Sequence, residues 1–241
     1  MHDILPSRRD WVLRGARDAL DLPAILIIAT MLGVGGMVRD IGLPVWAGTL
    51  STLTIWAGPA QVILFGAIGS GAAVPATAFA VGLSSARFLP MTVSVMPLVR
   101  KGGAGMASTL LAAHLVSMTT WIEGLRRLPS MADAGRMPYF LGYSLTIIGF
   151  GTLGTHAGYY LYTLVPGVIA AGLLFTTPLF FTAAMIAGAR SSADGLALCL
   201  GFFLTPLVAS YLPVGFDFLI IGVVGGTLAY LVGRRQRRRA A

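Results

Sequence analysis

Residues 138–189 read PYFLGYSLTIIGFGTLGTHAGYYLYTLVPGVIAAGLLFTTPLFFTAAMIAGA and contain no aspartate, glutamate, lysine or arginine. A helix that crosses a lipid bilayer needs about 20 mostly apolar residues, so these 52 positions are too many for one crossing. The run divides at Val165-Pro166-Gly167, because proline interrupts the hydrogen-bond ladder of a helix. The stretch therefore predicts two transmembrane helices.

Apolar runs of similar character extend on both sides of this stretch. They cover Leu22–Val38, Leu43–Gly69, residues 72–99 with Arg87 as the one charge, Gly102–Ile122, and Gly195–Gly233 with Asp217 as the one charge. The last run divides at Leu212–Gly215. The sequence thus predicts an all-α, polytopic membrane protein of about eight transmembrane helices. A seven-span version, in which one hydrophobic stretch is re-entrant, stays open.

The composition agrees with a membrane protein. Hydrophobic residues make up 56% of the chain and charged residues 11%, whereas a soluble domain is usually about a quarter charged. This excludes a cytosolic enzyme and a coiled coil, and the single cysteine, Cys199, excludes a disulfide scaffold. Thirty-one glycines suit close packing of transmembrane helices, which is how we interpret Gly33-Val34-Gly35-Gly36.

The basic residues predict the topology and the domain boundaries. Cytoplasmic loops carry an excess of lysine and arginine, and with both termini in the cytoplasm thirteen basic residues fall inside and three outside. The net charge of +8 does not indicate nucleic acid, because five of the seventeen basic residues lie in the last eight positions and suit an anionic membrane face. We expect a basic interfacial segment over 1–21, a transmembrane domain over 22–233 and a basic cytoplasmic tail over 234–241.

Catalytic and metal-binding patterns are missing from the sequence. His2, His114 and His156 lack the spacing of metal ligands, and a histidine in a membrane helix usually hydrogen-bonds a neighbouring helix. Ser84 and Ser85 lack the Gly-x-Ser-x-Gly motif of a serine hydrolase. The sequence predicts no enzyme, no metal and no cofactor, and an intramembrane hydrolase is the least favoured alternative.

Two segments predict interrupted helices at membrane depth. In Trp56–Gln61, Pro59 removes a backbone donor, Gly58 adds flexibility and Gln61 places an amide in an apolar run. Transporters use such breaks to present helix ends to the carboxylate or ammonium group of a substrate. The sequence therefore predicts that Gly58, Pro59 and Gln61 line a binding site, and a simple proline kink is the alternative.

The second interruption carries a charge. Arg87 follows Ser84 and Ser85 within Gly82–Pro90, and an arginine near the centre of a span costs about 2.5–3.5 kcal/mol on insertion scales. Its fork of donors suits a carboxylate, so Arg87 is the candidate that holds or gates the substrate, with the two serines beside it. The alternative is a structural tie to helix-terminal carbonyls or to Glu123, which is our candidate for gating or ion pairing.

Several segments together resemble the AzlC family, the large subunit of bacterial branched-chain amino acid exporters. The resemblance rests on Leu22-Pro23, Gly33 with Gly36, Ile41-Gly42-Leu43, Ser51, Trp56-Ala57-Gly58-Pro59-Ala60-Gln61, the Arg87 stretch with Ser94 and Pro97, Thr120-Trp121-Ile122-Glu123, and Gly158–Phe181. It implies a location in the bacterial inner membrane and a small four-span partner similar to AzlD. It also implies export of branched-chain or similar small aliphatic amino acids.

Departures from the family pattern bear on the substrate more than on the fold. Pro59 replaces a small residue, Ser85 an asparagine, Phe88 a histidine, and Ile122 the acid before Glu123. Two alternatives therefore stay open beside the exporter, namely a channel or transporter for another small solute and a non-transporting scaffold subunit of a membrane complex.

Overall fold

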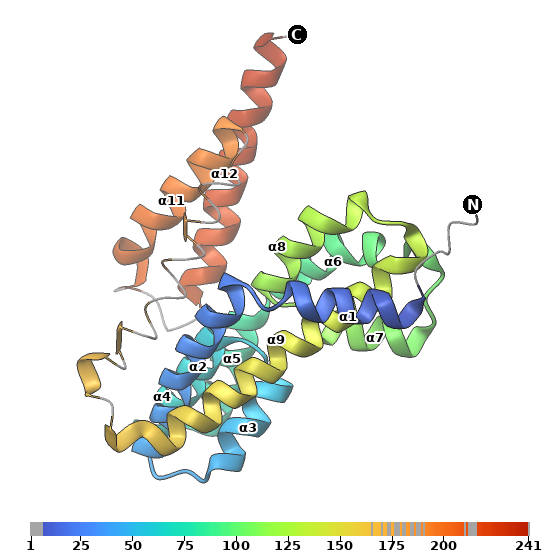
Figure 1. Ribbon diagram of the computed structural model, residues 1–241. Coiled ribbons are helices and arrows are strands. Elements are labelled where there is room, and N and C mark those ends of the chain that lie inside the picture. Colours follow the sequence, from blue (N-terminus) through green and yellow to red (C-terminus); the bar gives the residue numbers. More distant parts are fainter. Residues whose placement is uncertain are drawn as a thin grey trace.

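The computed structural model describes residues 7–164, 191–209, 211 and 216–240, and between them residues 166–169, 171, 172, 175, 179, 182, 183, 186 and 189. All regular elements in these residues are helices, which confirms the all-α prediction (Figure 1). The predicted divisions at Val165 and at residues 212–215 lie outside the described residues.

The described α-helices follow one another with short connections. They are α1 Arg8–Asp18, α2 Leu22–Asp40, α3 Val45–Thr54, α4 Gly58–Gly69, α5 Val74–Ser85, α6 Phe88–Val99, α7 Met106–His114, α8 Met118–Arg127, α9 Asp133–Leu161, α11 Ser192–Ala209 and α12 Phe216–Ala240. Short 3₁₀ turns lie at Arg100–Gly102, Leu128–Ser130 and Tyr162–Leu164. Helices α11 and α12 pack against each other, and α12 also contacts α5 (Figure 1).

Glycines bring α2 and α9 into backbone contact. The two helices lie side by side (Figure 1). A Cβ atom on Gly35 would lie 2.0 Å from the carbonyl oxygen of Thr155, and one on Gly158 would lie 2.0 Å from that of Leu32. No side chain fits at either position, so the packing role that the sequence predicts for the Gly33–Gly36 segment is confirmed at Gly35.

Glycines also bring α1 into backbone contact with the first half of α9. Ser7 and Asp10 form a capping box that begins α1. Gly15 and Gly142 then make reciprocal contacts, because a Cβ atom on either would lie 2.2 Å from a backbone oxygen of the other helix. The N-terminal helix is therefore packed along α9, an arrangement that its charged sequence did not indicate.

Three pairs of short helices are separated by breaks in the backbone. Helix α4 begins at Gly58, and α5 and α6 meet at a bend of 41° between Ser85 and Phe88, so both predicted interruptions are confirmed. A third break, Leu115–Ser117, separates α7 from α8. The sequence does not indicate this break, because residues 102–122 form one uncharged apolar run.

One helix in the described part of the chain, α2, is long and apolar enough to cross a membrane by itself. The number rises to two if the bent α5–α6 pair counts as a single span. The predicted eight spans stay a prediction.

The close contact between α2 and α9 can be tested by adding a methyl group at the contact. Gly158→Ala places a methyl group against the Leu32 carbonyl, so we expect the free energy of unfolding to fall by about 3 kcal/mol, the upper part of the usual range for overpacking. Gly149→Ala is the matched control on the same helix, because nothing lies within 4 Å of its Cβ position, and it should be neutral or stabilising. Thermal unfolding of the purified variants measures both, and equal stabilities would contradict the packing.

Candidate functional site

A cavity of about 70 Å³ lies where the helix breaks meet α2. Its walls come from the middle of α2, the α3–α4 break, the α5–α6 bend and the start of α8. The lining residues are Ile27, Thr30, Met31, Trp56, Ala57, Gly58, Pro59, Arg87, Phe88, Ser117, Met118 and Thr119.

The start of α4 forms one wall of the cavity. Trp56 has a φ of 48°, in the left-handed region, and Ala57 is extended, so the chain turns sharply before α4. No side chain caps the first turn of α4, and Pro59 has no N–H to be satisfied. The amides of Gly58 and Ala60 are thus left at a helix N-terminus, which carries partial positive charge.

The start of α8 forms a second wall. The Ser117 hydroxyl accepts a hydrogen bond from the Thr120 amide at 3.3 Å, and the Thr120 hydroxyl accepts one from the Ser117 amide at 2.8 Å. This capping box leaves the amides of Met118 and Thr119 at the cavity. The spacing of Ser117 and Thr120 was the sequence signal that could have revealed the break.

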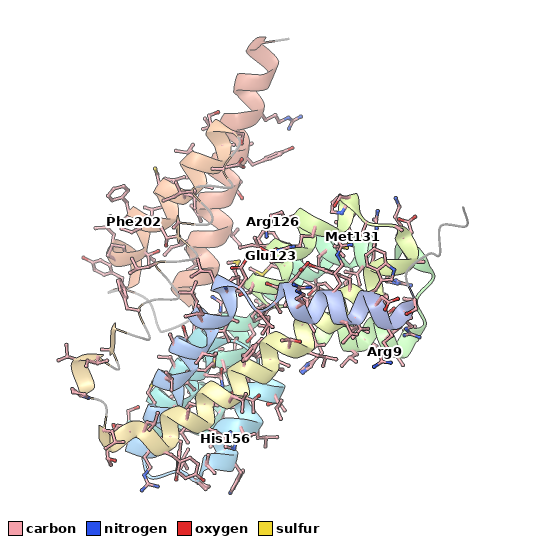
Figure 2. All side chains as sticks on the ribbon, in the orientation of Figure 1. Arg9, Glu123, Arg126, Met131, His156 and Phe202 are labelled. Atoms are coloured by element: carbon pink, nitrogen blue, oxygen red, sulfur yellow. The ribbon has the colours of Figure 1, made fainter. Side chains whose placement is uncertain are left out.

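His114 links α7 to α3, the two helices that lead into the α7–α8 and α3–α4 breaks. Nε2 of His114, the last residue of α7, lies 2.8 Å from the carbonyl oxygen of Leu53 near the end of α3. On α9, His156 contacts the Thr49 hydroxyl at 3.3 Å, near the lower end of the view in Figure 2. Both histidines therefore form hydrogen bonds to neighbouring helices, as the sequence predicts. The bond of His114 also holds the α3–α4 and α7–α8 breaks next to each other.

Arg87 lies at the cavity without a partner in the described part of the chain. Its side chain is exposed, and its guanidinium carbon lies 5.3 Å from the centroid of the Phe88 ring. No described residue makes an ion pair or hydrogen bond with it. The guanidinium is therefore available to a bound anion.

Glu123 is engaged elsewhere. Its carboxylate binds Arg126 at 2.6 Å and Arg127 at 2.7 Å, and Glu123 and Arg126 lie close together in Figure 2. Arg127 also binds Asp18 at 2.9 Å, and the Tyr139 hydroxyl donates to the same Asp18 oxygen. The structure thus places Glu123 in an ion cluster that joins α1, α8 and α9, and not beside Arg87.

The structure brings together only part of the predicted site. Gly58, Pro59 and Arg87 line the cavity, whereas Gln61, Ser84 and Ser85 do not. Gln61 is fully buried, and its Nε2 donates to the Ser51 and Thr52 hydroxyls of α3 at 2.9 and 3.0 Å. Ser84 is also buried, and Ser85 donates to the carbonyl of Val81 within its own helix.

The arrangement suits a small molecule that has an anionic group and an apolar group. Two helix N-termini and Arg87 supply donors and positive charge. Ile27, Met31 and Phe88 supply apolar contact area. Among the described residues no cluster of histidine, cysteine, aspartate and glutamate side chains is suited to a metal ion.

Comparison with protein families finds one match. A family model described as "AzlC protein" matches residues 23–165, which is more than half of the chain and includes every residue that lines the cavity. No curated protein and no solved structure matches the chain.

Proposed function

The chain belongs to the AzlC family, and from this premise we propose that it is a membrane transporter subunit that exports branched-chain or similar small aliphatic amino acids from the cytoplasm. Family membership supports a transport-related role at a membrane. The observation that carries the proposal is the cavity between two broken helices, because transporters bind their substrates at such breaks.

In the proposed complex the carboxylate of the substrate lies between the N-termini of α4 and α8. Arg87, which has no ion pair in the described residues, turns toward the same carboxylate and binds it through two parallel N–H groups. The aliphatic side chain packs on Ile27 and Met31 of α2. Gly58 leaves room beside them, since it carries no side chain.

We also propose that the chain spans the bacterial inner membrane with both termini in the cytoplasm. In this arrangement α3 with α4, α5 with α6 and α7 with α8 are three interrupted crossings, beside α2, α9, one crossing over about 167–189, α11 and α12. The distribution of basic residues supports the orientation. The ion cluster of Asp18, Glu123 and Arg127 then lies at the cytoplasmic face, where charges are hydrated.

Arg87 gives the sharpest test of the function. Arg87→Lys keeps the charge but loses the planar fork, and Arg87→Ala loses both, so we expect export to fall by about tenfold or more in each variant. Both proteins should accumulate normally, because no described residue is left with an unpaired buried charge. Export and membrane abundance are measured together in a strain that is sensitive to valine-containing dipeptides.

Arg14→Ala is the matched control, because Arg14 also lies over an aromatic ring, at 5.4 Å from Trp11, but lies outside the cavity. It should export normally. Normal export by Arg87→Ala would remove Arg87 from the mechanism, and loss of both Arg87 proteins from the membrane would indicate a structural tie.

The orientation has its own test. Reporter fusions placed after Arg136 and at the C-terminus should both report the cytoplasm, because an even number of crossings follows Arg136 in the proposed arrangement. A periplasmic signal at the C-terminus would mean an odd number of spans and would rule out the eight-helix arrangement.

The resemblance to the AzlC family supports a partner, and we propose a small four-span membrane protein similar to AzlD. We expect the purified chain alone in liposomes to export little valine, and the chain purified together with this partner to export it. Full transport by the chain alone would show that no partner is required.

A further inference from the structure

The side chains around the cavity are unbalanced in charge. Among the twelve described residues that line it there is one cation, Arg87, and no aspartate or glutamate. The acidic residue of α8, Glu123, is already bound by two arginines. An ammonium group in this cavity would therefore meet positive charge without a carboxylate to offset it.

Trp56 adds a further donor. Its side chain is only 4% exposed, and its indole Nε1 has no hydrogen-bond partner in the described part of the structure. The Cζ3 edge of the ring packs on Gly151 of α9, at 2.7 Å from the Cβ position. Nε1 lies across the indole from that edge, and it is a fully enclosed donor in a residue that lines the cavity.

Two of the three hydroxyl groups in the described lining, those of Thr30 and Ser117, are engaged within the protein, and no described residue bonds the third, that of Thr119. Thr30 donates to the carbonyl of Leu26 at 3.0 Å, and the Ser117 hydroxyl accepts from the Thr120 amide. The groups that remain at the helix ends are amides of Gly58, Met118 and Thr119, which can only donate. The side-chain acceptors in the described lining are thus neutral hydroxyl oxygens, and none carries the negative charge that would offset an ammonium group.

From this balance we infer that the cavity recognises the carboxylate and the aliphatic group of its ligand and does not recognise an α-ammonium group. The 2-oxo acids that correspond to small aliphatic amino acids are then ligands of the same site. This rests on the proposed function, since it takes the cavity as the substrate site.

Calorimetric titration of the purified full-length protein, together with its small partner if the two purify as a complex, tests the inference. The ligands are 3-methyl-2-oxobutanoate, valine and isobutylamine, which share the branched chain and differ in their charged groups. The Kd of the oxo acid should be less than about ten times that of valine, and isobutylamine should not bind. A ratio of about ten or more, or binding of isobutylamine, overturns the inference and leaves the proposed export of amino acids intact, whereas binding of neither carboxylate overturns both.

Variants of the donors show whether the oxo acid binds in this cavity. Met118→Pro removes the amide at the first position of α8, where proline suits a helix, and Met118→Ala removes only the side chain. The proline variant should bind the oxo acid about fivefold more weakly than the alanine variant, as expected for one hydrogen bond. Trp56→Phe should weaken binding by a similar factor.

Met106→Pro at the first position of α7 is the control, because this exposed residue lies outside the cavity. It should bind the oxo acid as the unmodified protein does. Equal affinities of Met118→Pro and Met118→Ala, in proteins that unfold at the same temperature, overturn the placement of the carboxylate at α8.

Discussion

The backbone contact between α9 and its neighbours fixes the geometry of the whole described bundle. Because Gly158 and Gly35 have no side chains, α2 approaches α9 to atomic contact, and van der Waals packing of this kind is the main attraction between helices in a lipid environment. The same face of α9 receives the Trp56 ring at Gly151 and the Thr52 hydroxyl at Thr155. One helix therefore sets the position of both α2 and the α3–α4 break, and both line the cavity.

Each break frees backbone groups that must find partners, since an unpaired polar group at membrane depth costs several kcal/mol. At the α3 end the Leu53 carbonyl is satisfied by His114, and the Gln61 amide binds the hydroxyls of Ser51 and Thr52. At the α8 end Ser117 satisfies one amide. Polar side chains thus hold the ends of the broken helices together, and the first amides of α4 and α8 have no side-chain cap of their own at the cavity.

The sequence indicated those parts of the site that depend on local chemistry. Pro59 and the charge of Arg87 in an apolar run are exceptions that a single sequence reveals, and both lie at the cavity. The break at Leu115–Ser117 contains neither proline nor glycine, and its residues continue an apolar run. The hydropathy of the sequence therefore gave no sign of a break there. The partners of Gln61 depend on how α3 folds back over α4 and α9, which is a tertiary contact that no local pattern encodes.

Some charged groups of the described bundle are paired and others are not, and among the unpaired ones Arg87 lies at the cavity. Arg127 is held between Asp18 and Glu123, and Arg136 binds Asp133 at 3.0 Å, so these arginines stabilise the junction of α1, α8 and α9. Arg87 has no such partner among the described residues, although an arginine in a span is costly to insert. Arg87 lines the cavity beside two helix N-termini, which carry partial positive charge, so all three groups favour a negatively charged group in that place.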